Sequence, residues 1–401
     1  MQIKVLTRFA ALLVLSACME LGAPYSGSLN TLSVTAQYPE GFAPRAGAAV
    51  TVEGVSSDCA YKLLTDASGT ASTTLPDGIY RISIHDRDGA SVFNGTLDKV
   101  IVSGKDISIN LPLLYSKAGS LVIKELYCGG CSKAPEEGTY QSDQYLIVHN
   151  NDTEPYMLDG LCLGTLSPYN SNSNNPWVDT DGNLPDFLPV IQAVWRIGGS
   201  GNTFPLAPGE DAVICLRGAI DHSAQYPLSV NLNKPGYFVC YNPVYFPNPL
   251  YHPVPGSNIE EDHYLEVVIK TGQANAYTVS INSPAFIIFR PEEGTDIYAF
   301  VQEADHLVQV PGSSVDRVVT VPVDWVVDAL EVFNGGSSDN RKRLPASADA
   351  GYVTLSEIYK GRTLMRRVDE GASSEAGFEI LQDTNNSTQD FYERETQSLH
   401  P

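Results

Sequence analysis

The sequence predicts an all-β protein in which a small N-terminal β-sandwich is followed by a larger one. Between Leu29 and Leu114 the chain runs as short alternating apolar and polar segments separated by turn residues, a pattern typical of half-buried strands. Charged residues make up only 18% of the chain, while Tyr, Pro and Gly are abundant, and this balance favours strands joined by long turns. No window has a convincing 3.6-residue periodicity, so very little helix is expected.

Residues 1–17 have the layout of a cleaved secretion signal. Lys4 and Arg8 precede a short apolar stretch from Phe9 to Leu15, which the small residues Ser16 and Ala17 follow. A membrane-spanning helix needs about 20 apolar residues, because the hydrocarbon layer is roughly 30 Å thick. The stretch is therefore too short to remain as a membrane span.

The residues Leu15-Ser16-Ala17-Cys18 resemble the lipobox of bacterial lipoproteins, in which the Cys accepts acyl chains. The resemblance implies that Cys18 becomes the lipid-bearing first residue and that 18–28 form a tether. Each buried methylene contributes about 0.8 kcal/mol, so two or three acyl chains hold a protein on a bilayer. Glu20, close behind the Cys, partly resembles the acidic export signal of Bacteroidetes-type lipoproteins, which implies an outward-facing protein at the outer membrane.

The excess of acidic residues argues against a nucleic-acid partner. The chain has 47 Asp and Glu against 25 Lys and Arg, which gives a formal net charge of -22. Such a surface repels the phosphates of a nucleic acid, so no nucleic-acid partner is expected.

Six further cysteines form an even set, in an exported protein whose compartment permits disulfides. The pair Cys128-Gly-Gly-Cys131 has the spacing of a local disulfide, half a metal site or a redox pair. Redox use needs the first Cys at a helix N-terminus, yet a strand is expected before it. We therefore favour a structural disulfide, with metal binding and redox activity as alternatives. The six residues are Cys59, Cys128, Cys131, Cys162, Cys215 and Cys240.

The segment 29–116 resembles a carboxypeptidase-regulatory or transthyretin-like module. The resemblance rests on TDASG at 65–69 and on LPDGIYRI at 75–82, where Gly69 and Gly78 are expected to adopt positive φ in turns. Modules of this family are mostly spacers, so no site is expected here.

The remainder, 120–395, resembles an enlarged lamin-tail-type, immunoglobulin-like sandwich. The matching motifs are IKEL at 123–126, LDGL at 158–161, LAPGE at 206–210 and DTNNSTQDF at 383–391. Long insertions depart from that family, at 129–140, 168–189 and 221–258. An uncharacterised family of Bacteroidetes-type lipoproteins has the same order of modules, and the chain resembles a member of it.

Two apolar runs in this region predict buried backbone. Phe286-Ile-Ile-Phe289 is continuous enough for a buried strand, and the run from Val319 to Leu330 predicts a strand or a buried turn.

A polar run offers oxygen ligands at the alternate spacing that hard cations favour. It lacks the bidentate Glu of a full calcium loop, so we favour a polar turn, with Ca²⁺ as the alternative. The four residues are Asp179, Asp181, Asn183 and Asp186. The run Glu260-Glu261-Asp262-His263 is similarly ambiguous between a solvated loop and a ligand set.

The segment 236–255 is dense in aromatic residues and prolines. Exposed aromatic rings stack on sugars or fill pockets of a partner, whereas buried rings pack under a long loop, and both alternatives stay open. The candidate surface consists of Tyr237, Tyr241, Tyr245, Phe246 and Tyr251.

No catalytic motif is present: the chain has no H-E-x-x-H, G-x-S-x-G, P-loop or G-x-G-x-x-G, and no catalytic residue or resident cofactor is predicted. The sequence favours a non-catalytic, membrane-anchored binding or accessory lipoprotein. Its expected partners are an outer-membrane transporter of the TonB-dependent type, or a glycan or protein ligand. The alternatives are a metal-handling lipoprotein using Cys128 and Cys131, and a surface hydrolase acting on glycans.

Overall fold

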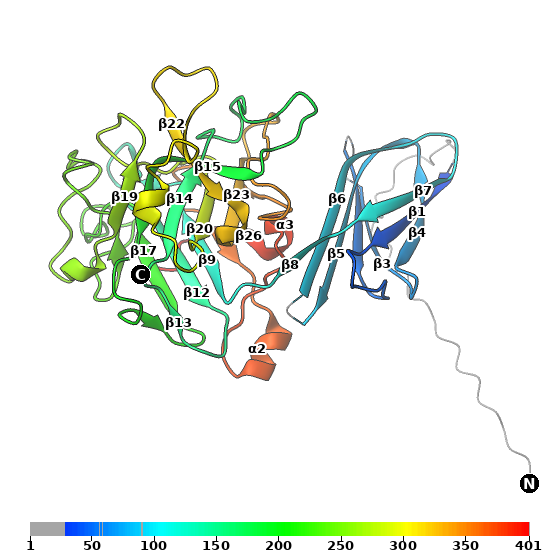
Figure 1. The fold of residues 1–401 in the computed structure, drawn as a ribbon, viewed down its shortest axis with the longest axis horizontal. Coiled ribbons are helices and arrows are strands. Elements are labelled where there is room, and N and C mark those ends of the chain that lie inside the picture. The colour runs from blue at the N-terminus through cyan, green and yellow to red at the C-terminus, as the bar shows by residue number, and fades with distance from the viewer. Residues whose placement is uncertain (1–28, 56, 58, 90, 401) are drawn as a thin grey trace, which may run out of the picture. The chain divides into compact units, whose positions relative to one another are not determined.

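The computed structural model describes residues 29–400 except 56, 58 and 90. Strands dominate these residues, which confirms the all-β prediction (Figure 1). The helices of this part are short: η1 (Glu261–His263), α1 (Ile297–Phe300), η2 (Val323–Trp325), α2 (Glu370–Ala376) and α3 (Ser387–Asp390). None of them is long and apolar enough to cross a membrane. The predicted signal peptide 1–17, the lipidated Cys18 and the tether 18–28 lie outside the described residues.

The described chain divides into two compact units. Residues 29–86 and 95–113 belong to the first, and residues 87–94 and 114–400 belong to the second.

The N-terminal region contains two sheets, of orders β4-β1-β7 and β3-β2-β5-β6-β8. Strand β1 pairs antiparallel with β4 and parallel with β7. The alternating pattern of the sequence produces the alternating burial of β1, so Leu32 and Val34 face the core. The strands are β1 (Leu29–Gln37), β2 (Ala49–Gly54), β3 (Ala60–Leu64), β4 (Thr70–Pro76), β5 (Gly78–Asp88), β6 (Ser91–Val102), β7 (Ile107–Pro112) and β8 (Leu114–Lys117).

The two glycines singled out in this region differ. Gly69 has φ +76°, in a turn where the Asp66 carboxylate accepts hydrogen bonds from the amides of Ser68 and Thr70, so that prediction is confirmed. The prediction for Gly78 is wrong, because Gly78 begins β5 and is not among the glycines with positive φ. A Cβ at position 78 would lie 3.2 Å from the Tyr80 ring, so a larger residue here would crowd that ring.

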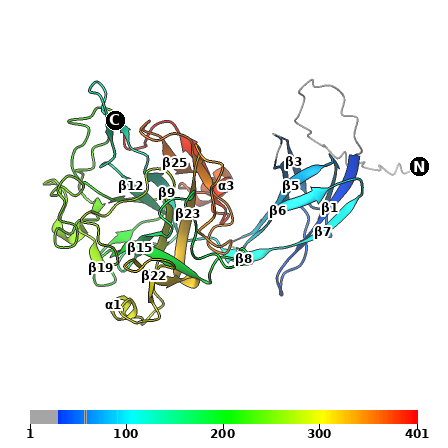
Figure 2. The same ribbon diagram turned by 90° about the horizontal axis from the view of Figure 1, so that it is seen from above.

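The larger unit contains a six-stranded and an eight-stranded sheet, which Figure 2 shows as separate layers. The six-stranded order β18-β17-β12-β9-β25-β26 uses β9 (Leu121–Tyr127), β12 (Tyr145–Asn150), β17 (Asp211–Cys215), β18 (Phe238–Val239), β25 (Thr363–Arg366) and β26 (Phe391–Arg394). The eight-stranded sheet has the order β21-β22-β15-β14-β20-β23-β24, with β19 also paired to β15. Its strands are β14 (Cys162–Leu166), β15 (Phe187–Arg196), β19 (Glu266–Lys270), β20 (Ala285–Phe289), β21 (Leu307–Gln309), β22 (Arg317–Pro322), β23 (Val326–Asn334) and β24 (Val353–Leu355).

Two small ribbons decorate the sheets. Strand β10 (Cys131–Ser132) pairs with β11 (Thr139–Tyr140), and β13 (Tyr156–Met157) pairs with β16 (Pro205–Leu206).

The core of the larger unit lies between the two sheets. Leu126 and Val148 of the first sheet and Trp195 and Phe286 of the second belong to one apolar cluster. A second cluster covers the other face of the eight-stranded sheet, and a third covers the other face of the six-stranded sheet. Both faces of these strands are therefore buried, which explains the continuous apolar runs.

The structure confirms both predicted apolar runs. All five residues of β20 are buried, as expected for 286–289. The run 319–330 contains the end of β22, the turn η2 and the start of β23, so it combines strand and turn.

Two buried arginines neutralise carboxylates inside this unit. Arg343 contacts Glu331 at 2.6 Å, and neither side chain is exposed. Arg366 forms ion pairs with three carboxylates, those of Asp328, Asp383 and Asp390. Charges inside a protein need such partners, because burial removes their hydration.

Candidate functional site

The predicted aromatic surface lies on an insertion that continues past β18. Phe246 is buried, and its ring centroid lies 5.5 Å from that of Trp195. Tyr245 is 43% exposed. The rings of Tyr237, Tyr241 and Tyr251 are half-buried. Of these five residues, Phe246 therefore packs in the core and fixes the loop there, Tyr245 is exposed, and the other three are intermediate.

Three aliphatic side chains of the same insertion face solvent. Val244 is 85% exposed, Leu250 81% and Val254 71%. We call these three residues the loop surface. Sequence reasoning singled out the aromatic residues of this segment and missed the aliphatic ones, although Pro and Asn neighbours mark the loop.

The backbone under the loop surface is held by short-range hydrogen bonds. The Asn242 side chain accepts from the amides of Val244 and Tyr245, at 3.1 and 3.2 Å. The Asn248 side chain accepts from the amide of Leu250 at 3.1 Å. The backbone carbonyl of Asn248 also accepts from the amide of His252 at 2.9 Å. These Asx turns stiffen a segment that has little regular secondary structure.

His252 fastens the far end of this loop to the core. The residue is 3% exposed, and its Nε2 lies 3.0 Å from both the amide nitrogen and the carbonyl oxygen of Tyr277. Burial lowers the pKa of His252 to about 4, so the ring is neutral at pH 7. The nearby positive charge of Arg217 acts in the same direction.

Arg217 lies beneath the loop, just after β17, and is only 2% exposed. It donates to the Gln141 carbonyl at 2.9 Å, and the carbon of its guanidinium lies 4.9 Å from the centroid of the Tyr251 ring. Its Nε is buried without a hydrogen-bond partner. Burial lowers the pKa of Arg217, while electrostatic interactions with Tyr169, Tyr251, Asp143 and Tyr359 raise it. Unlike Arg343 and Arg366, it forms no ion pair within the described residues.

The turn between Cys128 and Cys131 approaches the region around Arg217. The carbonyl of Gly129 accepts from the amide of Tyr359 at 2.8 Å. Tyr359 has φ +59°, a conformation that costs a non-glycine residue free energy and that clusters at functional sites. The aromatic loop, through Tyr251, and the turn, through Tyr359, therefore both approach Arg217.

The prediction of disulfides is wrong for this structure. All six cysteines of the described residues are free thiols: Cys59, Cys128, Cys131, Cys162, Cys215 and Cys240. Four of them are distributed over three apolar clusters: Cys128 and Cys240 belong to the central core, Cys162 to the second cluster and Cys215 to the third. These four cysteines fill the core as small apolar side chains, whereas Cys59 is only half-buried.

Burial also disfavours redox chemistry at the Cys128–Cys131 turn. Burial raises the pKa values of Cys128 and Cys131 to about 12, and the Asp143 carboxylate adds to the effect on Cys131. Both groups are therefore thiols at neutral pH, whereas a redox nucleophile needs a thiolate.

Asp143 is a fully buried carboxyl group that sequence reasoning missed. It accepts hydrogen bonds from Ser229 at 2.5 Å and from Tyr127 at 3.2 Å. Burial raises the pKa of Asp143. Nearby, His222 accepts from or donates to Tyr140 through Nδ1 at 2.7 Å, and its Nε2 contacts the Gly218 carbonyl at 2.7 Å. Both ring nitrogens of His222 thus make contacts that fix the insertion 221–258. Burial lowers the pKa of His222.

The predicted cation loop forms a polar turn. The Asp179 carboxylate accepts from the amides of Asp181 and Asn183, at 2.9 and 2.8 Å. These bonds lower the pKa of Asp179. Asp186 is exposed, and the three Asp carboxylates of this loop do not gather as a possible ligand group.

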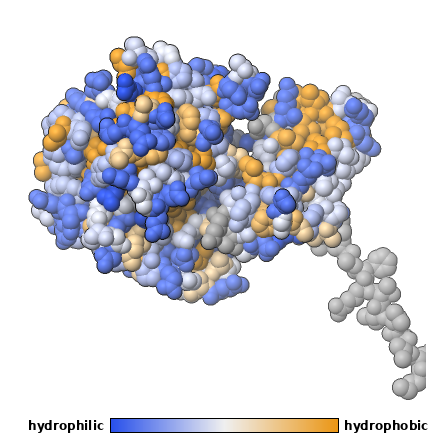
Figure 3. All heavy atoms as spheres, in the orientation of Figure 1, coloured by the Kyte–Doolittle hydropathy of each residue, from blue (hydrophilic) through white to orange (hydrophobic). Residues whose placement is uncertain are grey.

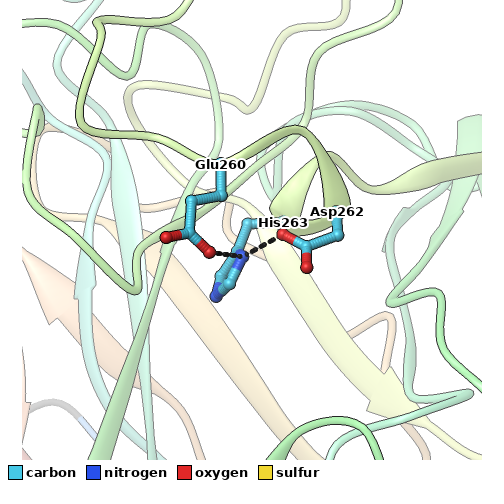
Figure 4. A group of neighbouring side chains, drawn as sticks. All are labelled: Glu260, Asp262 and His263. Atoms are coloured by element: carbon cyan, nitrogen blue, oxygen red, sulfur yellow. Dashed lines mark hydrogen bonds and ion pairs between the residues drawn. The ribbon is translucent and has the colours of Figure 1, made fainter.

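A cluster that the sequence left ambiguous does gather ligand atoms. Oxygens of Glu260 and Asp262 lie 3.9 and 2.8 Å from Nδ1 of His263 (Figure 4). The His263 ring packs 4.7 Å from the Phe238 ring, which orients it. The two carboxylates are 72% and 63% exposed, so water solvates them.

The face of the larger unit drawn in Figure 3 is mostly hydrophilic, with apolar patches between the polar areas. A polar surface of this kind agrees with the net charge of -22.

Comparisons with known proteins find one matching family and several matching solved structures. Residues 207–398 match the DUF4876 family, described as "Protein of unknown function". No curated protein matches. A crystal structure of a DUF4876 family protein from Bacteroides thetaiotaomicron is 24% identical, with a TM-score of 0.59, and the match covers 92% of this chain and 96% of that chain.

Two further solved structures match with TM-scores too low to support any conclusion. A DUF3823 family protein from Parabacteroides merdae has 16% identity and a TM-score of 0.19, over 43% of this chain and 83% of that chain. The minor pilin GBS52 of Streptococcus agalactiae has 16% identity and a TM-score of 0.18, over 22% of this chain and 44% of that chain. The chain thus resembles DUF4876 proteins in sequence over 207–398 and has the fold of the Bacteroides structure.

Proposed function

We propose that this chain is a non-catalytic, lipid-anchored protein of the outer membrane that faces outward and binds a protein partner. The observation that carries the proposal is the loop surface, in which Val244, Leu250 and Val254 are each more than 70% exposed on one hydrogen-bonded loop. Single exposed apolar residues are ordinary, and three of them on one short loop offer more apolar surface to a partner than one residue does.

The stiffness of the loop supports this function. Phe246 and His252 bury their side chains in the core, so the exposed residues between and beside them have a defined backbone. A preorganised surface loses less conformational entropy on binding than a mobile one. The partner we propose is an outer-membrane transporter, because a lipid at Cys18 would keep both proteins in the same membrane.

The metal-handling alternative has less support. Within the described residues, Cys128 and Cys131 do not gather with a third His, Cys or carboxylate as a possible ligand group. We therefore do not advance it.

Replacing the three residues of the loop surface with Ser is expected to abolish co-purification of the partner from detergent-solubilised membranes. The unfolding temperature should change little, because the side chains are exposed. The measurement is affinity purification of the full chain followed by mass spectrometry. A matched control replaces Leu64, Ile101 and Val315, which are 68%, 58% and 65% exposed elsewhere. Equal recovery of the partner with both variants would contradict the proposal.

Replacing Cys18 with Ala is expected to remove fatty-acid incorporation and to move the protein from the membrane fraction to the soluble fraction. The physical reason is the loss of about 0.8 kcal/mol per buried methylene of the acyl chains. Labelled palmitate and cell fractionation provide the two readouts. Ala replacement at Cys59 is the control. Unchanged labelling of the Cys18 variant would refute lipidation.

A further inference from the structure

We infer that the partner contacts the loop surface with an acidic segment, in which Asp or Glu stands next to apolar residues. This inference rests on the proposed function and adds the chemistry of the partner. Two observations support it. The insertion that contains the loop surface lacks acidic residues, and two cations without an ion-pair partner contact it.

The insertion differs in composition from the rest of the chain. Asp and Glu account for 47 of the 401 residues, yet none occurs from 222 to 259. Lys234 is the one Lys or Arg of that range, and it is exposed. Within the described residues, the hydrogen bonds of 242–255 involve no carboxylate. The segment therefore interrupts a sequence that is otherwise acidic.

Lys270, the last residue of β19, supplies the first cation. Its Nζ donates to the carbonyl of Tyr245 at 3.0 Å and lies 5.2 Å from the centroid of the Phe246 ring. Within the described residues Lys270 forms no ion pair, and Glu266, at the other end of β19, pairs with Arg196 instead. A carbonyl and a ring thus hold the charge of Lys270 against the loop without neutralising it.

Arg217 supplies the second cation, under the ring of Tyr251. It forms no ion pair within the described part of the chain, and its Nε has no hydrogen-bond partner. The carboxyl group that acts on its charge is that of Asp143. Burial raises the pKa of Asp143 and so disfavours its negative charge. Even with Asp143 ionised, Lys270 and Arg217 together leave one positive charge at the loop.

Charge and apolar surface together specify the partner. The exposed side chains of Val244, Leu250 and Val254 favour apolar groups, while Lys270 and Arg217 attract anions. Opposite charges at an interface orient the partner and exclude basic competitors. A narrow segment senses mainly the charges nearby, since salt screens interactions beyond about 8 Å. An anionic membrane is a poorer match, because its broad surface also meets the other charges of a chain with net charge -22.

The test selects random peptides, displayed on phage, against the immobilised full chain. Selected peptides are expected to be enriched about twofold in Asp and Glu over the starting library and depleted in Lys and Arg. Selection against a variant with Val244→Ser, Leu250→Ser and Val254→Ser should lose these sequences. Peptides without acidic enrichment, no selected peptide, or the same peptides on the Ser variant would each overturn the inference. Sedimentation with phosphatidylglycerol vesicles through the loop surface, in place of peptide binding, would assign the surface to a membrane instead.

Charge variants connect the acidic preference to the cations. Fluorescence anisotropy measures the affinity of the strongest selected peptide. Lys270→Met is expected to weaken its binding about threefold, whereas Lys105→Met, at an exposed lysine of the N-terminal region, should leave it unchanged. Raising NaCl from about 0.05 M to about 0.5 M should also weaken binding to the native chain. If Lys270→Met fails to fold, this salt dependence decides the question. Binding that responds neither to salt nor to Lys270→Met would contradict the inference.

The outcomes separate this inference from the proposed function. If the Ser variant loses the membrane partner while the selected peptides show no acidic preference, the acidic segment is refuted and the protein-binding function stands. If the Ser variant recovers the membrane partner in full, the proposed function itself is refuted.

Discussion

Replacing Arg366 with Met is expected to lower the free energy of unfolding of the larger unit by about 3–5 kcal/mol. The Arg366 side chain is 1% exposed, and its three carboxylate partners are at most 10% exposed. The guanidinium also donates to the Ile123 carbonyl at 2.6 Å, which ties β25 to β9. Methionine keeps the apolar stem but leaves several buried negative charges without a cation.

Denaturant unfolding followed by far-ultraviolet circular dichroism measures this effect. Arg362→Met is the matched control, because Arg362 also pairs with carboxylates, Glu393 at 2.7 Å and Glu357 at 3.4 Å, but its side chain is 28% exposed. Exposed ion pairs contribute about 0–1 kcal/mol. A similar small loss in both variants would show that the buried ion cluster contributes no more than the surface one.

Acidification is expected to destabilise the larger unit through His252. The unfolded chain takes up a proton near the ordinary pKa of 6.5, whereas the folded state does so only near pH 4. The stabilising contribution is therefore fully present above pH 6.5 and is lost as the pH falls from there to about 4. Each unit of difference between the folded and the unfolded pKa corresponds to about 1.4 kcal/mol. Full protonation of His252 therefore lowers the free energy of unfolding by about 3 kcal/mol.

The measurement compares the unfolding free energy at pH 7.5 and pH 4.5 for the native chain and for His252→Gln. Gln keeps an acceptor for the amide of Tyr277 but does not titrate. The variant should lose less stability on acidification, whereas His306→Gln, at a side chain that is 30% exposed, should behave as the native chain. Equal losses in all three proteins would mean that His252 does not cause the pH dependence.

Local sequence patterns predicted the strands well, because the burial of one or both faces of a strand determines where its apolar residues stand. The alternation of β1 and the continuous apolar run of β20 are each visible within a few residues. Sheet order was not predictable in the same way. The pairing of β9 with β25 joins Leu126 to Leu364, which are distant in the chain, and no local pattern encodes it.

The candidate site residues also differ in whether a local sequence pattern could predict them. Asp179 was predictable as a polar turn, since its hydrogen-bond partners lie within four residues. The convergence of Tyr251 and Tyr359 on Arg217 and the contact of Lys270 with Tyr245 depend on distant segments. The cysteines were misjudged for a related reason: an even count says nothing about which face of a sheet each thiol occupies.

The position of β25 and β26 also affects the order of events during biosynthesis. Strand β9 is among the first parts of the larger unit to be synthesised. Of its two neighbours in the sheet, β12 follows soon after, but β25 is among the last parts to be made. Until residue 366 is available, that edge of β9 lacks the strand that pairs with it in the finished sheet, and β26 arrives later still. The larger unit therefore completes its six-stranded sheet only after almost the whole polypeptide has been made.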